Sequence, residues 1–274
     1  MIEIHLSDNL ELMKKIKDQS IDLIYSDILY GTGKKYPEYE DILNKKRTVK
    51  DHYWHRIHEM HRILKPTGSI YLQMDTRINH WIRDILDYAF GEENFRNEIV
   101  WIDEYKLKQP KNKYTNHGER ILFYTKSNKY TFNIQKVPHK TTIAHQEACR
   151  RVPSVKSGKY KAPYSEGKNC GDVWDDIKNI TYKSKENTGY STQKPEKLIE
   201  RIILASSNPG DMVADFYMGS GTTAVISERN SRDFIGCDNS KKAIKITTER
   251  VLNEFGEILK IVKDGYVSQV IDNI

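Results

Sequence analysis

Short apolar runs alternate with helical patterns over both ends of the chain. An apolar run of four to eight residues predicts a buried strand, and apolar residues three or four positions apart predict a helix. The predicted strands cover residues 2–6, 21–25, 69–74, 97–102, 121–125, 212–215 and 233–238. The predicted helices cover residues 9–16, 49–64, 78–90, 195–207, 219 to about 229, and 240–252. Strands that alternate with helices indicate an α/β fold, a doubly wound and mostly parallel sheet with helices on both faces.

The pattern weakens between residues 128 and 190, a stretch that is rich in Lys, Ser, Pro and Tyr. A segment of this length without a sustained period, inside a compact domain, is usually functional or disordered. We therefore expect one domain in two pieces, residues 1–127 and 191–274, with an insertion at 128–190.

Length and charge agree with this division. The 274 residues allow one large domain with an insertion. The formal net charge is +6, but residues 105–190 hold 18 lysines and arginines against 7 aspartates and glutamates, whereas the rest holds 26 against 31. Such a basic third is typical of a protein that binds a polyanion, although a well-solvated surface would give the same count.

Several classes of protein are disfavoured. No run approaches the roughly 20 apolar residues of a membrane span, and the first residues do not resemble a secretory signal, so we expect a cytoplasmic protein. Three cysteines without a CxxC pair predict neither a disulfide framework nor a zinc site. Histidines recur every third residue from His52 to His61, but this spacing turns them around a helix, so we expect no shared metal.

The strongest motif is Val-Ala-Asp-Phe-Tyr-Met-Gly-Ser-Gly-Thr-Thr at residues 213–223. A predicted strand ends at Asp215, turns through Gly219 and Gly221, and enters a helix. Such glycines let a ligand approach the backbone and the N–H groups of the helix, although an ordinary tight turn would look the same. The next strand ends in Asp238, where an acid commonly binds ribose hydroxyls. The motif lacks the lysine of a P-loop, which disfavours ATP and GTP.

Two further motifs point to the same sheet edge. The strand that begins at residue 21 delivers Asp27 and Tyr30 to its carboxyl end, where ligands bind parallel sheets. A carboxylate accepts hydrogen bonds from an amino group and a phenol offers a stacking face, so the pair could hold a flipped-out base; alternatively, the acid caps a loop and the tyrosine packs. The segment Ser-Thr-Gln-Lys-Pro at 191–195 opens a helix, and its lysine could also meet a ligand carboxylate.

In their order, the three motifs resemble those of the S-adenosylmethionine-dependent DNA amino-methyltransferases of the permuted, or β, group. In that group a catalytic Asp-Pro-Pro-Tyr motif precedes a target-recognition insertion, a Thr-Gln-Lys-Pro motif and the cofactor glycine motif. This chain has residues 27–30, the basic insertion, 192–195 and 219–221 in the same order. The resemblance covers nearly the whole chain. It implies a Rossmann-like methyltransferase whose catalytic part is 1–127, whose target-recognition insertion is 128–190, and whose cofactor-binding part is 191–274.

The resemblance also implies roles for individual residues. Asp27 matches the catalytic carboxylate, the carbonyl of Ile28 is the second acceptor for the target amine, and Tyr30 matches the stacking aromatic. Residues that match the family's binding positions for S-adenosylmethionine are Asp8, Thr192, Gln193, Lys194, Asp215, Tyr217, Gly219, Ser220, Gly221, Thr222 and Asp238.

Two departures separate this chain from the family pattern. Ile28 and Leu29 replace both prolines of the catalytic motif, so the backbone there lacks the restriction that a proline imposes. Phe216 and Tyr217 stand where Pro-Phe is usual, and Tyr217 keeps the aromatic contact.

The resemblance implies methyl transfer to double-stranded DNA. An aspartate at the first position of the motif favours the N6 amine of adenine over the N4 amine of cytosine. The basic side chains expected to contact DNA are Lys106, Lys108, Lys111, Lys113, Arg150 and Arg151. Of these, the arginine pair is the candidate for reading guanine, because arginine can bond guanine bidentately.

Several alternatives stay open from the sequence. Loss of the prolines also suits a catalytically weakened DNA-binding protein on the same scaffold. RNA and protein-glutamine methyltransferases usually carry the cofactor motif first, so the motif order argues against them. The sequence leaves open whether a cognate restriction endonuclease exists and whether the chain forms a homodimer.

Overall fold

The computed structural model describes residues 1–41, 45–102, 110–112, 114–138, 167–256, 260–263 and 266–268. The central sheet has ten strands in the order β10-β6-β7-β5-β2-β11-β12-β1-β13-β14. Its strands are β1 (Ile2–Leu6), β2 (Ile21–Asp27), β5 (Leu64–Met74), β6 (Phe95–Ile102), β7 (Gly118–Thr125), β10 (Val173–Trp174), β11 (Met212–Asp215), β12 (Asp233–Asp238), β13 (Lys260–Lys263) and β14 (Tyr266–Ser268). Two small sheets pair β3 (Lys34–Lys35) with β4 (Glu40–Asp41) and β8 (Lys136–Val137) with β9 (Lys168–Asn169).

Most neighbours in the central sheet are parallel. The exceptions are β7, which is antiparallel to β5 and β6, and β14, which is antiparallel to β13. The predicted doubly wound, mostly parallel α/β fold is therefore confirmed.

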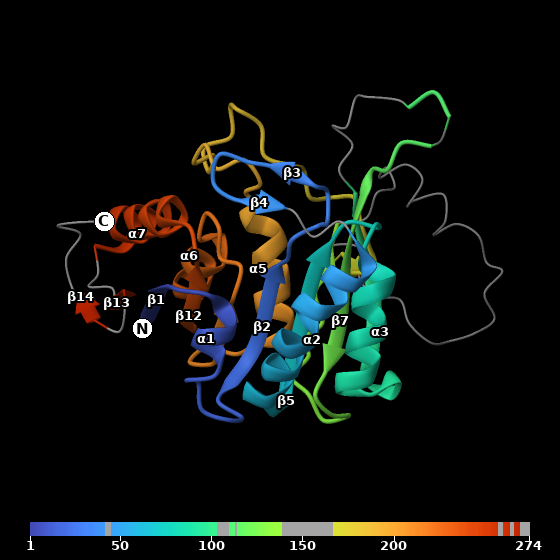
Figure 1. Cartoon of the computed structure of the whole chain (residues 1–274), viewed down its shortest axis with the longest axis horizontal. Helices are drawn as coiled ribbons and strands as arrows, with labels where there is room; N and C mark the ends of the chain where they lie inside the picture. Colours follow the sequence, from blue (N-terminus) through green and yellow to red (C-terminus); the bar gives the residue numbers. More distant parts are fainter. Residues whose placement is uncertain are drawn as a thin grey trace, which may run out of the picture.

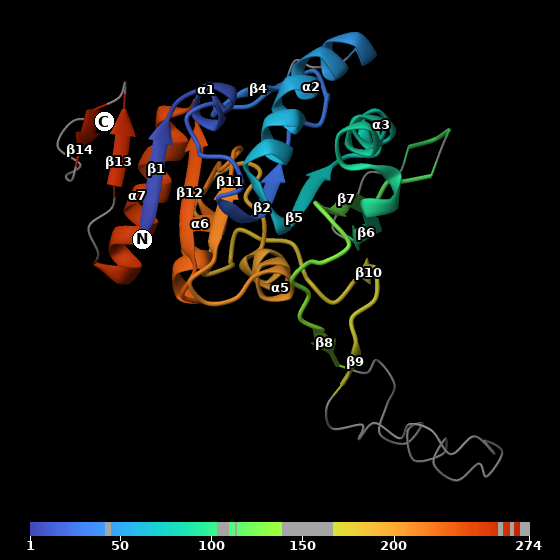
Figure 2. The same ribbon diagram turned by 90° about the horizontal axis from the view of Figure 1, so that it is seen from below.

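Helices cover both faces of the sheet (Figures 1 and 2). They are α1 (Asn9–Met13), α2 (Lys46–Ile63), α3 (Asn79–Phe90), α5 (Glu196–Ser206), α6 (Thr222–Arg229) and α7 (Lys241–Phe255), with one 3₁₀ turn at Glu92–Asn94. The apolar faces of α1, α2 and α3 pack into one core cluster, and those of α5, α6 and α7 into another. Figure 2 shows α2 and α3 on the opposite side of the sheet from α5. Within the described residues, no helix has both the length and the apolar character of a membrane span.

The observed elements differ from the predicted ones mainly at their ends. The strand predicted to begin at residue 69 already begins at Leu64, because Leu64 pairs with Ile21 before the register shifts to the Leu23–Ser69 pair. That irregularity accommodates Pro66, whose missing N–H would interrupt a regular ladder. Helix α1 ends at Met13 instead of residue 16, because the N–H groups of Lys15 and Ile16 bond three positions back, as in a 3₁₀ turn.

Part of the predicted insertion joins the main sheet. Strand β10 pairs in parallel with β6, and the buried Trp101 indole donates a hydrogen bond of 2.9 Å to the carbonyl of Ile177. The boundaries at residues 128 and 190 stay a prediction, since much of that segment lies outside the described residues.

The turn between β11 and α6 requires glycine at a defined place. Gly221 has φ of +75° and precedes the first residue of α6. A Cβ atom at this position would lie 2.3 Å from Cγ2 and 2.4 Å from Oγ1 of the Thr247 side chain, which is fully buried on α7. The turn can therefore approach α7 only because residue 221 has no side chain.

We expect Gly221→Ala to lower the free energy of unfolding by about 3 kcal/mol, because it combines a left-handed backbone with a steric overlap. Urea unfolding followed by circular dichroism measures this change. Gly210→Ala is the matched control: Gly210 has φ of +85° but open space around its missing Cβ, so we expect a loss of only about 1–2 kcal/mol. Equal losses in the two variants would contradict the steric argument.

Candidate active site

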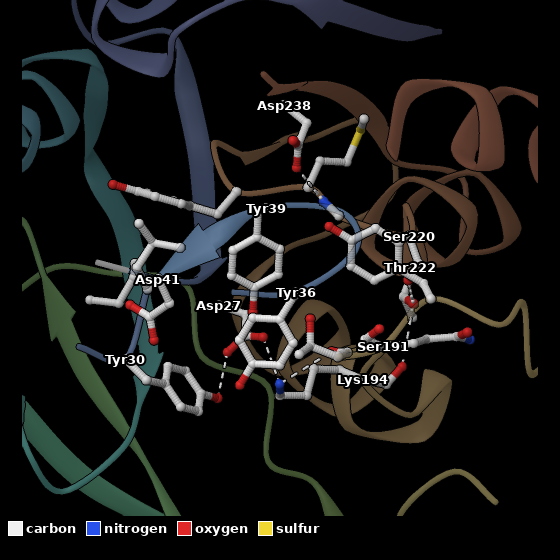
Figure 3. Close-up of a pocket in the computed structure, with 18 of the residues that line it drawn as sticks. Asp27, Tyr30, Tyr36, Tyr39, Asp41, Ser191, Lys194, Ser220, Thr222 and Asp238 are labelled. Atoms are coloured by element: carbon white, nitrogen blue, oxygen red, sulfur yellow. Dashed lines mark hydrogen bonds and ion pairs between the residues drawn. The ribbon is translucent and has the colours of Figure 1, made fainter. Parts of the chain in front are cut away.

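Three adjacent parallel strands end in carboxylates at one edge of the sheet. β2 ends at Asp27, β11 at Asp215 and β12 at Asp238, and these strands are neighbours in the sheet. A cavity of about 1040 Å³ opens at this edge, and all three carboxylates line it. Figure 3 shows Asp27 and Asp238 in its wall. Segments from both ends of the chain therefore meet around a single cavity.

Nearly all residues assigned from the sequence to the catalytic and cofactor motifs lie in this cavity wall. The lining includes Asp8, Asp27, Ile28, Tyr30, Thr192, Gln193, Lys194, Asp215, Tyr217, Gly219, Ser220, Thr222 and Asp238. Gly221 stands behind the wall, against Thr247. The catalytic and glycine motifs, nearly 190 residues apart in sequence, thus share one cavity.

Asp238 and Asp215 organise the glycine turn. Asp238 accepts hydrogen bonds from the backbone N–H of Gly219 at 2.9 Å and of Ser240 at 2.8 Å. Asp215 accepts from the backbone N–H of Tyr217 at 3.0 Å and from the Thr223 hydroxyl at 2.6 Å. Burial raises the pKa of Asp215 to about 7. Both carboxylates therefore fix the backbone that surrounds the cavity.

Asp8 lies at the rim of the cavity. Its Oδ1 accepts from the backbone N–H of Leu10 at 2.8 Å and so caps α1, and its Oδ2 pairs with Arg56 at 2.8 Å. The side chain of Asp8 is half exposed, which leaves it accessible from the cavity.

The segment at 192–194 is bonded to the glycine turn. The hydroxyl of Thr222 donates to the carbonyl of Lys194 at 3.3 Å. Gln193 accepts from the backbone and side chain of Thr188 and donates to the carbonyl of Glu186 at 2.6 Å. The side chain of Gln193 is thus used to hold its own loop, whereas Lys194 is left to extend across the cavity.

Lys194 and Asp27 form a buried ion pair. The distance from Nζ to Oδ2 is 2.6 Å, and the two side chains are 10% and 19% exposed. Burial raises the pKa of Asp27 to about 6 against the lowering effect of Lys194, and the negative charge of Glu119 adds to the increase. Burial alone would lower the pKa of Lys194, but Asp27 and Glu119 raise it above its ordinary value.

Tyr30 bridges two carboxylates. Its hydroxyl lies 2.6 Å from Oδ1 of Asp27 and 2.6 Å from Oε2 of Glu119. The Tyr30 ring also lies 5.4 Å from Nζ of Lys194, within cation–π range. Figure 3 shows Tyr30 and Lys194 on either side of the Asp27 carboxylate.

The loop that lacks the two family prolines is held by hydrogen bonds. The N–H of Ile28, which a proline would not have, donates to the carbonyl of Gln73 at 3.1 Å. The carbonyl of Leu29 accepts from the buried Tyr53 hydroxyl at 3.2 Å. The backbone between Asp27 and Tyr30 is therefore fixed by β5 and α2 instead of by proline rings.

The β3–β4 hairpin covers the cavity and was not predicted from the sequence. Its Tyr36 and Tyr39 rings stack 4.8 Å apart, and Figure 3 shows them between Tyr30 and Ser220. Glu38 accepts from the Ser191 hydroxyl at 2.9 Å and from Lys242 at 2.8 Å. The hairpin is too short for periodicity to reveal it, and the one signal in its sequence is a pair of tyrosines in a Gly- and Lys-rich loop.

Glu119 is another cavity residue that the sequence does not reveal. It lies near the start of β7, whereas ligands are expected at the carboxyl ends of parallel strands. β7 is antiparallel to β5, so its start lies at the same edge as the end of β2.

Most of the residues expected to contact DNA lie outside the part of the chain that the structure describes. Lys111 is exposed, and Lys106, Lys108, Lys113, Arg150 and Arg151 lie outside the described residues. Across the described ranges, no group of three or more His, Cys, Asp or Glu side chains is arranged to hold a metal ion.

Comparisons with known proteins agree with this geometry. A family model described as DNA methylase matches residues 21–249. The chain is 32% identical over 250 residues to the type II methyltransferase M.HpaI of Haemophilus parainfluenzae, covering 91% of this chain and 74% of that protein. It is 34% identical over 248 residues to the DNA adenine methyltransferase YhdJ of Escherichia coli, covering 89% and 80%.

Solved structures share the fold. The putative DNA modification methylase TTHA0409 of Thermus thermophilus, complexed with S-adenosyl-L-methionine, matches 97% of this chain and its own full length, with a TM-score of 0.62 and 19% identity. The complex of M1.HpyAVI with S-adenosylmethionine matches 92% of this chain and 99% of its own, with a TM-score of 0.57 and 22% identity. With the family model spanning most of its length and relatives above 30% identity, the chain belongs to the DNA methylase family.

Proposed function

We propose that the protein transfers the methyl group of S-adenosylmethionine to the N6 amine of an adenine flipped out of double-stranded DNA. The observation that carries this proposal is the shared cavity, in which the buried carboxylate of Asp27 faces the same space as the Gly219 turn. The choice of adenine is supported by the aspartate at position 27 and by the names of relatives such as YhdJ.

The residues around the cavity fit S-adenosylmethionine. A volume of about 1040 Å³ is at the upper end of ligand sites and suits a cofactor together with a base. The Gly219 turn offers backbone that a ligand can approach, Asp238 and Asp8 suit hydroxyl and amino donors, and Lys194 suits a carboxylate. When bound, the cofactor supplies a methyl group already activated by a sulfonium.

The protein's own contribution is orientation and charge. The amine of adenine is a weak nucleophile because its lone pair is conjugated with the ring. Asp27 and the carbonyl of Ile28 accept the two amine hydrogens, which turns the lone pair toward the methyl donor. Tyr30 lies beside this position as the aromatic contact for the flipped base.

Further partners belong to the same proposal. The basic residues between 105 and 190, including Lys111, bind the phosphates of double-stranded DNA. We also propose that the protein is cytoplasmic, that it forms a homodimer and that it has a cognate restriction endonuclease as its partner.

Asp27→Ala is expected to lower the rate of methyl transfer at least about 100-fold, because the amine loses its charged acceptor. Transfer of labelled methyl from S-adenosylmethionine to DNA, with sequencing of modified bases from a methylation-free host, measures the rate and identifies the base. Asp51→Ala is the control: Asp51 is exposed on α2 and does not line the cavity. A parental rate in Asp27→Ala would rule out this function for the carboxylate.

The pH dependence of the same rate provides a separate test. Asp27 is a charged acceptor for the hydrogen bond of the amine only when it is ionised, and burial raises the pKa of Asp27 to about 6. The rate should therefore fall as the pH is lowered through about 6, well above the range in which an exposed aspartate protonates. Single-turnover rates between pH 5 and 8 measure this acid limb of the pH–rate profile. A rate that stays constant down to pH 5 would contradict the role of ionised Asp27.

A further inference from the structure

Glu119 reaches the catalytic carboxylate through one shared hydroxyl. Its side chain is 13% exposed, lines the cavity, and touches the Tyr30 hydroxyl through Oε2. Oδ1 of Asp27 touches the same hydroxyl from the other side, also at 2.6 Å. The three groups form a hydrogen-bonded chain from Asp27 through Tyr30 to Glu119.

This chain contains two short oxygen–oxygen contacts but only one phenol proton. A tyrosine hydroxyl donates a single hydrogen bond, and an ionised carboxylate only accepts. With both carboxylates ionised, one of the two contacts therefore has no proton. One more proton would give Glu119–OH donating to the Tyr30 oxygen and Tyr30–OH donating to Asp27, with every contact satisfied.

We propose that Glu119 is a positioning residue for methyl transfer and that, through Tyr30, it takes up the proton released by the methylated amine. This inference rests on the proposed function of Asp27. The amine nitrogen forms a bond to the methyl carbon as the carbon–sulfur bond breaks, and the nitrogen becomes positively charged. Its proton passes to Asp27, the proton of Asp27 to Tyr30 and the proton of Tyr30 to Glu119, so that Asp27 is ionised again and Glu119 is neutral.

The surrounding groups hold Glu119 in this position. Gln73 Nε2 donates to Oε2 of Glu119 at 2.6 Å. The amide of Gln73 is itself oriented, because its Oε1 accepts from the buried Tyr25 hydroxyl at 2.7 Å. The Oε2 atom that touches Tyr30 therefore has a fixed location on β7.

Charge favours the same uptake. Asp27 and Glu119 carry two negative charges beside the single positive charge of Lys194, whose Nζ lies 2.6 Å from Asp27 and 3.6 Å from Glu119. One additional proton makes this buried cluster neutral, which burial favours over a net charge.

Glu119→Gln tests the inference, because glutamine keeps the size of the side chain and one acceptor oxygen but cannot take up a proton. We expect the single-turnover rate of methyl transfer on the pH plateau to fall about 10- to 100-fold, with the KM values for DNA and S-adenosylmethionine within about twofold of the wild type. The acid limb of the rate should move to lower pH, since loss of the negative charge of Glu119 lowers the pKa of Asp27.

Tyr30→Phe interrupts the same chain while keeping the aromatic ring. If the chain acts as a unit, the double variant Tyr30→Phe/Glu119→Gln should be no slower than the slower single variant. Glu98→Gln is the matched control: Glu98 lies on the neighbouring strand β6, pairs with Arg120 and does not line the cavity. Thermal unfolding of each variant checks that it is folded.

Two results overturn the inference while leaving the proposed function intact, and both require an active wild type. In the first, Glu119→Gln has the parental rate and the parental pH dependence. In the second, Glu119→Gln is slower, but its acid limb is unchanged and its loss of rate is additive with that of Tyr30→Phe. A wild-type protein that transfers no methyl group to DNA overturns the proposed function, and this inference with it.

Discussion

The carboxyl ends of adjacent parallel strands meet at one edge of a sheet, and the arrangement of this protein depends on that constraint. β2, β11 and β12 each end in an aspartate, so three acids that are far apart in the chain surround one cavity. Each acid then needs partners that compensate for its burial. Asp238 finds them in backbone N–H groups of the turn, Asp215 in a backbone N–H and the Thr223 hydroxyl, and Asp27 in Lys194 and Tyr30.

These partners distinguish the aspartates that stabilise the turns from the aspartate proposed to act in catalysis. An aspartate bonded to backbone N–H groups cannot change partners without unfolding its turn. Asp27 is bonded to the side chains of Lys194 and Tyr30, which can move. Burial raises the pKa of both Asp215 and Asp27, but of the two it is Asp27 that pairs with a charged side chain. Groups with such perturbed pKa values, in a cavity and with a specific charged partner, are typical of catalytic sites.

Much of the fold and the site could be predicted because strong local patterns carry them. Alternating apolar runs and helical periods predicted the mostly parallel sheet, and the acids that end β2, β11 and β12 followed from where those runs stop. Glu119 could not be found in this way, because nothing in its local sequence shows that β7 runs antiparallel to its neighbours. The β3–β4 hairpin was missed because two-residue strands carry no period, and the early start of β5 was missed because Pro66 lies inside an irregular pairing.

The contacts of Glu38 have a consequence for how a ligand enters and leaves the cavity. Glu38 connects the hairpin that covers the cavity to Ser191 on one side and to Lys242 on α7 on the other, so it joins three segments that are distant in the chain. We expect a ligand of the size of a nucleoside to leave the cavity faster when these two contacts are broken. Since one of the two contacts is an ion pair with a half-exposed lysine, raising the ionic strength should weaken the attachment of the hairpin and shorten the residence time of a ligand beneath it.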